Sequence, residues 1–187
     1  MPVQLNQKPE HSFDQPIGLL SDCHRRIEHF LGVVQRVLRS TKGKALDEEH
    51  RRAINAALKY FDEAAPRHTA DEEESLFPRL RAAAEHHPAL REALSKLDNL
   101  EADHDAADRL HSEMRHWCLQ WLDHGLAPPQ LKRLSRIVDV LATLYRHHIA
   151  IEDNELFPLA ASSMGEKALR DVGGEMALRR GLELKHT

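Results

Sequence analysis

The chain has 187 residues and a formal net charge of −4 at pH 7 with histidine counted as neutral. This length predicts one domain, alone or with short appendages, that can fold without a metal or a disulfide. The charge argues against a nucleic-acid-binding protein, and no apolar run approaches the length of a membrane span. The N-terminal residues lack the features of a signal peptide, and two cysteines do not make a disulfide framework, so the cytoplasm is the expected compartment.

The first half of the chain predicts an irregular arm followed by a helical hairpin. Residues 1–16 contain three prolines and little periodicity, which is typical of an arm without regular structure. A first helix is expected from about 17 to 40. A second helix is expected to begin near Asp47, which can cap it. Pro66 should kink this helix, and Pro78 should end or bend it.

The second half of the chain predicts another helical hairpin and a tail. Helices are expected from about 88 to 124, where a glycine follows, and from 128 to 157. The expected division is therefore an arm over 1–16, a helical bundle over 17–160 and a tail over 161–187. The centre of the tail predicts a short helix that covers one end or edge of the bundle.

Each of the four long predicted helices has an apolar face with polar residues set into it. Apolar side chains recur three and four residues apart, which is the spacing of an inward-facing helix surface. A histidine lies on this face in every helix, and in two helices a glutamate follows it four residues later. The six residues are His24, His68, Glu72, His104, His148 and Glu152.

A repeat relates these residues to one another. The stretch RHTADEEESLFPRL, which begins at Arg67, returns as HHIAIEDNELFPLA, which begins at His147. The offset is 80 residues (147 − 67), and the same offset separates His24 from His104 (104 − 24). Two copied hairpins, each unable to bury its apolar face alone, predict an all-α, up-down-up-down four-helix bundle. Its pseudo-twofold symmetry would bring the four histidines to one level of the core.

Histidine and glutamate in this arrangement point to a metal site. Residues four apart lie on one helical face, so one imidazole and one carboxylate can reach the same ion. An ionised glutamate on an inward face is costly unless a cation accompanies it. Imidazole with carboxylate suits iron, zinc or manganese better than calcium or magnesium. The order and spacing differ from the Glu-x-x-His of ferritin-like sites and from the His-Glu-x-x-His of zinc proteases.

These residues resemble the hemerythrin-like, His-His-Glu cation-binding domains. His24, the stretches RHTADEEESLFP and HHIAIEDNELFP, and EADHD around His104 follow the order of ligands in that family. The resemblance covers residues 17 to 160. It implies an oxo- or hydroxo-bridged non-haem centre of two iron ions that reacts with dioxygen, nitric oxide or peroxide.

The hypothesis for the ligands divides the six residues between two ions. His24 and His68 are terminal ligands of one ion, and His104 and His148 are terminal ligands of the other. The two glutamates, Glu72 and Glu152, bridge the ions. No catalytic residue is assigned.

Three further residues are candidates for additional ligands or for groups behind the ligands. Glu28 and Asp108 each follow a histidine by four residues, and Asp108 stands where oxygen-carrying hemerythrins have a second histidine. Either carboxylate could instead be solvated. Tyr145 lies one turn before His148, either as a core residue or as a hydrogen-bond partner of a ligand. His111 is expected to be a core or solvent-channel histidine.

Residues off the apolar faces are expected to be solvated, and they include His147, Glu73, Glu74 and Asp153. The departures from the oxygen carriers favour a sensor of dioxygen or nitric oxide, or a protein that handles iron. A redox enzyme of peroxidase or oxidase type is the alternative, and a structural bundle with a vestigial site is the third reading. The sequence leaves open whether the protein is an enzyme and which protein partner it has.

Overall fold

A computed structural model describes residues 9–85, 90–91 and 94–182 of the chain, and every described element of regular structure is helical. The first hairpin consists of α1 (Pro16–Thr41) and α2 (Glu48–Glu63), continued by α3 (Ala65–Ala70), η1 (Asp71–Leu76) and α4 (Phe77–Ala84). The second consists of α6 (Leu97–Asp123) and α7 (Pro128–Ile151), continued by η2 (Glu152–Leu156) and α8 (Phe157–Ser163). A last helix, α9, spans Glu166–Leu178.

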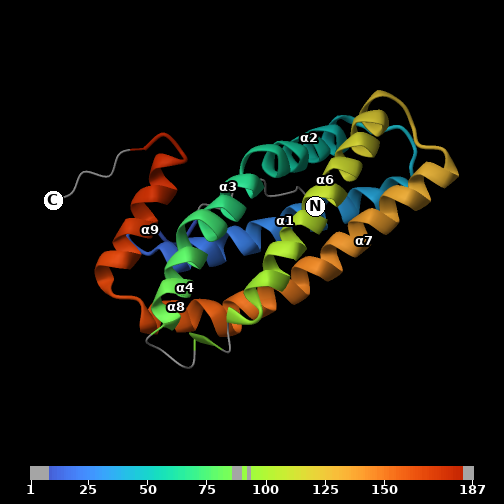
Figure 1. The fold of residues 1–187 in the computed structure, drawn as a ribbon. Coiled ribbons are helices and arrows are strands. Elements are labelled where there is room, and N and C mark those ends of the chain that lie inside the picture. The colour runs from blue at the N-terminus through green and yellow to red at the C-terminus, as the bar shows by residue number, and fades with distance from the viewer. Residues whose placement is uncertain (1–8, 86–89, 92–93, 183–187) are drawn as a thin grey trace.

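The four long segments form the predicted four-helix bundle. Around the bundle, α1 packs on α2, α2 on α6, α6 on α7, and α7 back on α1. Figure 1 shows the two hairpins lying side by side, with both interhelical turns at one end of the bundle. The all-α fold class is therefore confirmed. No helix in the described ranges has both the length and the apolar character that a membrane span requires.

The turns at that end hold the two hairpins together. In the first turn Lys42 and Gly43 have positive φ angles of 51° and 78°, which reverse the chain after α1. The carbonyl of Gly43 accepts a 2.9 Å hydrogen bond from the amide of Leu126 in the second turn. The indole of Trp121 donates a 2.9 Å hydrogen bond to the carbonyl of Lys44. Because these bonds cross between hairpins, they help to fix the register of one hairpin against the other.

Two apolar cores lie along the bundle, one on each side of a polar layer. The larger core extends from the turns to positions such as Ile27, Ala65 and Tyr145. The other core includes Leu20 and Leu156 and lies at the opposite end of the bundle. In the first three long segments the candidate metal ligands fall between the last residue of one core and the first residue of the other, and in the fourth His148 stands one residue before Ile149, the last member of the larger core. The layer is therefore enclosed by hydrocarbon above and below, where a charge is poorly solvated.

Most expected boundaries agree with the structure, and three differ in instructive ways. Asp47 caps α2, since its carboxylate accepts a 2.9 Å hydrogen bond from the amide of His50. The helix is interrupted at Ala64, two residues before Pro66. Pro78 does not end its helix, because a widened turn precedes it and α4 follows. The helix expected from residue 88 begins at Leu97; residues 86–89 and 92–93 lie outside the described part. The last long helix passes through η2 into α8 and ends at Ser163.

The tail folds back onto the bundle. Helix α9 packs against η1 and α1, and Asp71 of η1 is fully buried while Arg179 and Arg180 bind it at 2.9 and 2.7 Å. Glu175 of α9 forms a 2.6 Å ion pair with Arg79. The predicted covering role of the C-terminal helix agrees with this packing, while the division of the chain at residue 160 stays a prediction.

Residues 9–15 lie between α1 and α9. The amide of His11 donates a 2.8 Å hydrogen bond to the buried carboxylate of Asp22 in α1. The carbonyl oxygen of Phe13 approaches Gly173 of α9 so closely that a Cβ atom at Gly173 would lie 1.9 Å from it. Gly174, the next residue, has no atom within 4 Å of the corresponding position. The absence of a side chain at Gly173 therefore lets the N-terminal segment pack against α9.

A pair of neighbouring substitutions tests this contact. Gly173→Ala is expected to reduce the free energy of unfolding by about 1–3 kcal/mol, because the methyl group must displace the backbone at Phe13. Gly174→Ala meets open space and should be neutral or stabilising by up to about 1 kcal/mol, the helix propensity difference between alanine and glycine. Thermal unfolding followed by circular dichroism measures both. Equal midpoints for the two variants would contradict the close approach of Phe13.

Candidate metal centre

The candidate ligands come from six stretches of helix that meet in the polar layer. His24 lies on α1, His68 on α3 and His104 on α6. His148 lies near the end of α7, and the two glutamates open the widened segments η1 and η2. All six side chains are buried. The sequence repeat thus corresponds to a repeat in space, with one His-Glu pair from each hairpin.

Each glutamate is placed by a widened helical turn. In η1 the amide of Phe77 bonds to the carbonyl of Glu72, and in η2 the amide of Phe157 bonds to the carbonyl of Glu152. Both bonds span five residues instead of four, which is the pattern of a π-helix. A proline follows each phenylalanine, and in a regular α-helix its ring would clash with the carbonyl of the preceding turn. The extra residue in the turn lets the helix continue past this proline. The Leu-Phe-Pro that ends each repeat therefore belongs to the geometry of the site.

One group of ligand atoms lies on the side of α1 and α3. His24, His68 and Glu72 each offer an atom within 4.8 Å of the others. Nε2 of His68 is 3.4 Å from Oε1 of Glu72, and Nε2 of His24 is 3.6 Å from the same oxygen. Nε2 of His24 is also 3.0 Å from Oε2 of Glu152. Glu152 thus reaches this group from the other hairpin.

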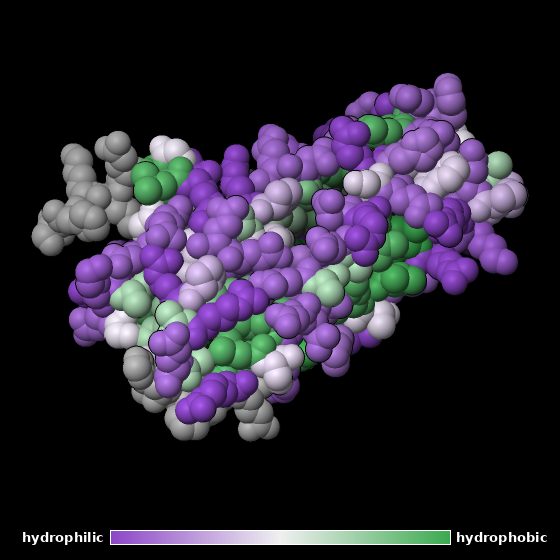
Figure 2. All heavy atoms as spheres, viewed as in Figure 1, coloured by the Kyte–Doolittle hydropathy of each residue, from purple (hydrophilic) through white to green (hydrophobic). Residues whose placement is uncertain are grey.

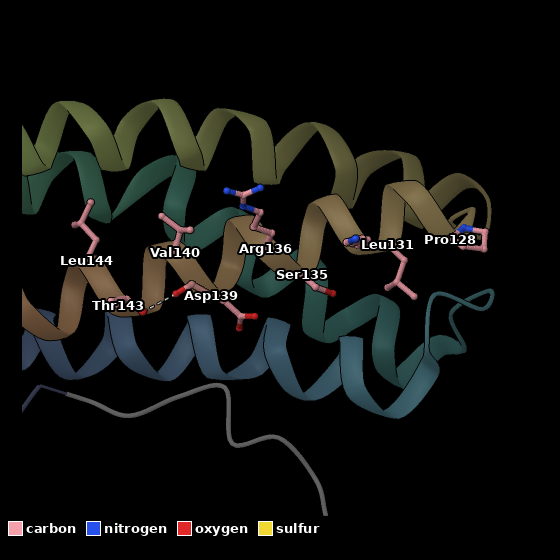
Figure 3. A pocket seen from close by; sticks show the side chains of 9 residues that line it. Pro128, Leu131, Ser135, Arg136, Asp139, Val140, Thr143 and Leu144 are labelled. Carbon is pink, nitrogen blue, oxygen red and sulfur yellow. Dashed lines mark hydrogen bonds between the residues drawn. The ribbon is translucent and has the colours of Figure 1, made fainter.

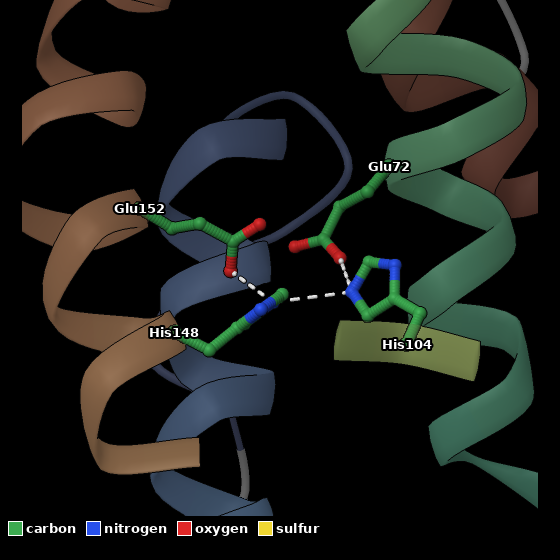
Figure 4. Close-up of side chains that lie close together, drawn as sticks. All are labelled: Glu72, His104, His148 and Glu152. Carbon is green, nitrogen blue, oxygen red and sulfur yellow. Dashed lines mark hydrogen bonds and ion pairs between the residues drawn. The ribbon is translucent and has the colours of Figure 1, made fainter. Parts of the chain in front are cut away.

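A second group lies between α6 and α7, and Figure 4 shows its four side chains pointing toward one another. Its members are Glu72, His104, His148 and Glu152, with ligand atoms again within 4.8 Å. Nε2 of His104 is 3.1 Å from Nε2 of His148 and 3.4 Å from Oε2 of Glu72. Nε2 of His148 is 3.1 Å from Oε2 of Glu152. Glu72 belongs to both groups, one oxygen facing each.

The imidazole nitrogens and carboxylate oxygens are arranged better for binding a cation than for hydrogen bonding to one another. Among the described residues, both oxygens of Glu72 and both oxygens of Glu152 are buried without a hydrogen bond of acceptable geometry. Nε2 of His24 is in the same condition although carboxylate oxygens lie near it. Buried carboxylates that lack donors are strongly unfavourable. Two divalent ions, one in each group, would satisfy these atoms at once.

The protonation of the site in the metal-free chain supports the same conclusion. Burial lowers the pKa of His68 to about 4, so its imidazole is neutral and free to bind a metal. Burial opposes the charged form of Glu72, but the nearby His68 and His104 hold its pKa well below the usual range. Burial also opposes protonation of His104, but its hydrogen bond to Glu72 raises its pKa to about 9. In the absence of a metal, protons on imidazoles therefore balance the carboxylate charge.

Carboxylates behind the candidate ligands bond to two of the imidazoles and lie near a third. Nδ1 of His104 is 2.8 Å from Oε1 of Glu73, and Nδ1 of His24 is 3.0 Å from Oδ1 of Asp153. A third carboxylate, that of Asp103, is 3.5 Å from Nδ1 of His148. A carboxylate at Nδ1 holds a proton there and leaves the Nε2 lone pair facing the centre. The outer ring of the site is therefore also negatively charged.

The expectation that Glu73 and Asp153 are merely solvated is wrong. Both are partly exposed, but each bonds to a ligand histidine of the other hairpin. The signal was present in the repeat, because each residue directly follows the glutamate of its own His-x-x-x-Glu. Which histidine each carboxylate contacts depends on how the two hairpins pack against each other, and the sequence of one helix does not show this. His147 is exposed as expected, and Glu74 is exposed but bonds to Arg179.

Glu28 and Asp108 are not brought into the centre. Both side chains are exposed, and neither belongs to the two groups found among the described residues. Helical rotation explains the difference, because the faces of α1 and α6 that carry His24 and His104 turn away from the core four residues later. The idea of four His-x-x-x-carboxylate ligand pairs is therefore corrected to two.

Tyr145 and His111 form a buried polar pair beside the centre. The hydroxyl of Tyr145 lies 2.9 Å from Nε2 of His111, and burial lowers the pKa of His111 to about 4, so this imidazole is neutral. The ring of Tyr145 lies 6.4 Å from that of His148. Tyr145 is a buried core residue, the first of its two expected roles, and its hydroxyl bonds to a histidine outside the candidate ligand set. His111 is partly buried, as expected for a channel position.

A small pocket joins this pair to the surface. Its volume is about 240 Å³, and its lining includes Glu73, His104, Asp108, His111 and Tyr145. Asp108 is exposed, whereas His104 is buried in the layer. The pocket therefore leads from solvent to the group of ligand atoms between α6 and α7.

A larger groove lies elsewhere and contains none of the candidate ligands. It has a volume of about 970 Å³ and follows the outer face of α7 from Pro128 to Leu144, as the close-up in Figure 3 shows. Val140 in this groove is 43% exposed, and a hydrophobic area interrupts the largely hydrophilic surface over α7 in Figure 2. Its lining offers no cluster of imidazole and carboxylate, so size alone does not identify the functional site.

Comparison with known proteins identifies the bundle. A protein-family model described as the hemerythrin HHE cation binding domain matches residues 15–160. A relative from Haemophilus influenzae, described as an uncharacterized protein, is 24% identical over 169 residues, which cover 90% of this chain and 92% of the relative. The similarity thus extends beyond the bundle into the N-terminal segment or the tail. The name of this relative adds no activity.

The carboxylates behind the ligands can be tested separately from the ligands. Glu73→Gln and Asp153→Asn are each expected to weaken metal binding about 10- to 100-fold, because the proton on Nδ1 of His104 or His24 is then held less firmly. Competition with a chelator of known affinity measures the change. Glu28→Gln, also a carboxylate on a bundle helix but exposed, is the matched control and should not alter the affinity. An equal effect of all three substitutions would show a general loss of charge instead of an oriented contact.

Proposed function

Because the chain belongs to the hemerythrin HHE cation-binding family, we propose that it holds two iron ions and uses them to bind a small molecule such as dioxygen, nitric oxide or peroxide. One observation carries the proposal. Glu72 faces both groups of imidazoles, and its oxygens, like those of Glu152, are buried without a hydrogen bond of acceptable geometry among the described residues. A mononuclear site would leave half of these atoms unsatisfied.

The proposed ligands follow from the two groups. His24 and His68 would hold one ion and His104 and His148 the other, while Glu72 and Glu152 lie near both groups and would offer carboxylate oxygens to both. This mixture of nitrogen and oxygen donors suits iron, while zinc and manganese are the alternatives to test. When bound, the ions would supply redox chemistry or a Lewis acid to a molecule in the pocket.

The protein's own residues determine how a small molecule reaches the centre. The pocket of about 240 Å³ opens beside Asp108 and ends at His104, so we propose it as the access route. Its volume suits a diatomic molecule or peroxide and excludes most larger substrates. The apolar cores on both sides of the layer keep bulk water from the ligands. The simplest use of this arrangement is sensing or iron handling.

A redox enzyme of peroxidase or oxidase type is the second candidate, and the Tyr145–His111 pair favours it. The two groups lie in the wall of the pocket and share a 2.9 Å hydrogen bond. A neutral imidazole beside a phenol can accept or return a proton during turnover. A module that only binds a gas does not need such a pair.

The proposed setting is the cytoplasm. Cys23 and Cys118, the two cysteines of the chain, are both buried and unpaired. Burial raises the pKa of Cys118 to about 12 and that of Cys23 above its ordinary value, so neither is a reactive thiolate. Free thiols suit a reducing compartment.

Metal loading tests the ligand set. Protein made without a chelating tag and loaded anaerobically with ferrous iron is expected to retain two ions per chain, measured by elemental analysis. Glu72→Ala should lose most of both ions, because it removes the shared carboxylate. Glu28→Ala also removes a carboxylate four residues after a histidine and should keep both. A helical far-UV spectrum for both variants shows that the fold persists.

Several results would contradict this assignment. Fewer than one ion per chain in the unaltered protein would exclude a dinuclear centre. Unchanged metal content in Glu72→Ala, or an equal loss in Glu28→Ala, would place the ions elsewhere. Loading with zinc or manganese in competition with iron determines the preferred metal without assuming it.

Reaction with small molecules separates the two candidate functions. For a sensor, the visible spectrum of the ferrous protein should change on adding dioxygen or nitric oxide and return when the gas is removed. For an enzyme, oxidation should not reverse, and peroxide should be consumed with turnover. Tyr145→Phe should then slow turnover while leaving metal content unchanged, because it removes the hydroxyl that His111 contacts. Reversible binding with no effect of Tyr145→Phe would exclude the enzyme.

A further inference from the structure

A second cavity lies on the opposite side of the first hairpin from the access pocket. It has a volume of about 720 Å³ and is bordered by residues 9–13, α1, and the segment from α2 to α3. None of the six candidate metal ligands lines it. Its volume falls in the range of sites for organic molecules rather than for gases. We call this cavity the α1–α2 groove.

The floor of the α1–α2 groove is aromatic and firmly held. Tyr60 stacks on Phe30 with ring centres 4.6 Å apart and an angle of 23° between the planes. The hydroxyl of Tyr60 donates a 3.2 Å hydrogen bond to the carbonyl of Cys23 on α1. Both rings are buried among the helices and line the groove. Because the two rings stack on each other, they form a rigid apolar base for the groove.

The rim of the groove is cationic, with more positive than negative side chains. Arg26, Lys59, Arg67 and Arg180 line it, while Glu63 is the one carboxylate in the lining. Lys59 pairs with Glu63 at 2.7 Å, and Arg180 pairs with Asp71.

Two of these cations have no ion-pair partner among the described residues. Within residues 9–85, 90–91 and 94–182, neither Arg26 nor Arg67 has a carboxylate within ion-pairing distance.

Arg26 is already positioned for an anion above the aromatic floor. Its guanidinium carbon lies 5.0 Å from the centre of the Tyr60 ring, a cation–π contact that limits the motion of the side chain. A guanidinium presents paired N–H donors that match a carboxylate, sulfonate or phosphate. A guanidinium with no ion pair among the described residues, at the edge of a largely apolar cavity, therefore favours a ligand with an acidic group and an apolar body.

We propose that the α1–α2 groove binds a small amphipathic organic anion, with its apolar part against the apolar lining of the groove, which includes Leu19 and Ala56, and its acidic group on Arg26 and Arg67. This site is separate from the metal centre, and the proposal does not depend on whether iron is bound.

A pair of fluorescent probes tests the proposal on the full chain. 8-Anilinonaphthalene-1-sulfonate carries an aromatic body and a sulfonate, whereas N-phenyl-1-naphthylamine has the same body without the charge. In Arg26→Gln/Arg67→Gln the dissociation constant of the sulfonate is expected to rise at least about tenfold, as loss of charge-assisted hydrogen bonds predicts. The neutral probe should bind the variant and the unaltered protein equally.

Control variants show where the probe binds. Ala56→Phe fills the groove from α2 and should weaken both probes. Arg136→Gln and Val140→Glu alter the groove on α7, which is also apolar, and should leave sulfonate binding unchanged. Sulfonate binding that is unaffected by Arg26→Gln/Arg67→Gln and Ala56→Phe, or that is lost in Val140→Glu, would overturn the proposal. A helical far-UV spectrum is required of every variant, and Ala56→Phe serves as the independent test if the double variant unfolds.

Discussion

The constraint that organises this protein is the burial of two ionised glutamates in a layer between two apolar cores. Glu72 and Glu152 are fully buried, and within the described part of the chain their oxygens lack hydrogen-bond donors of acceptable geometry. A charge in such a place is tolerated only if an opposite charge lies beside it. In the metal-free chain protonated imidazoles fill this role, as the raised pKa of His104 to about 9 indicates. Divalent cations would fill it better, because they bind the oxygens and the imidazole nitrogens together.

The secondary structure is adjusted to this constraint. The glutamates stand at the first residue of η2 and the second residue of η1, so the widened turns begin where the ligands are. A widened turn interrupts the regular hydrogen bonding of a helix, and such turns are frequent at functional sites. Packing of α9 on η1, through Asp71 and its two arginines, stabilises the interruption in the first hairpin. In the second hairpin, α8 continues directly from η2.

Sequence periodicity was sufficient to predict the bundle and the six residues that meet in the layer, because an inward face repeats every three or four residues regardless of the neighbouring helix. The contacts of Glu73 and Asp153 were missed for the opposite reason. Each lies beside a ligand of its own helix but bonds to a histidine from the other hairpin, and this depends on the relative rotation of two helices. Glu28 was overestimated because spacing alone does not show where a helix face turns to solvent. The start of the third long helix was misplaced because proline at residue 88 resembles a helix start, whereas α6 begins at Leu97.

The two halves of the centre are not equivalent, despite the repeat. Neither Nδ1 of His148 nor Nδ1 of His68 has a hydrogen-bond partner among the described residues, but the carboxylate of Asp103 lies 3.5 Å from His148, whereas the residue 80 positions earlier is Cys23 (103 − 80). A carboxylate behind an imidazole makes it a stronger donor to a metal. The ion held by His104 and His148 would therefore have better supported ligands than its neighbour. It is also the ion next to the pocket, since His104 lines that pocket. Of the two proposed ions, the one between α6 and α7 would be the one that meets a molecule entering by the pocket. The other, beside α1 and α3, would help to hold the shared carboxylates in place.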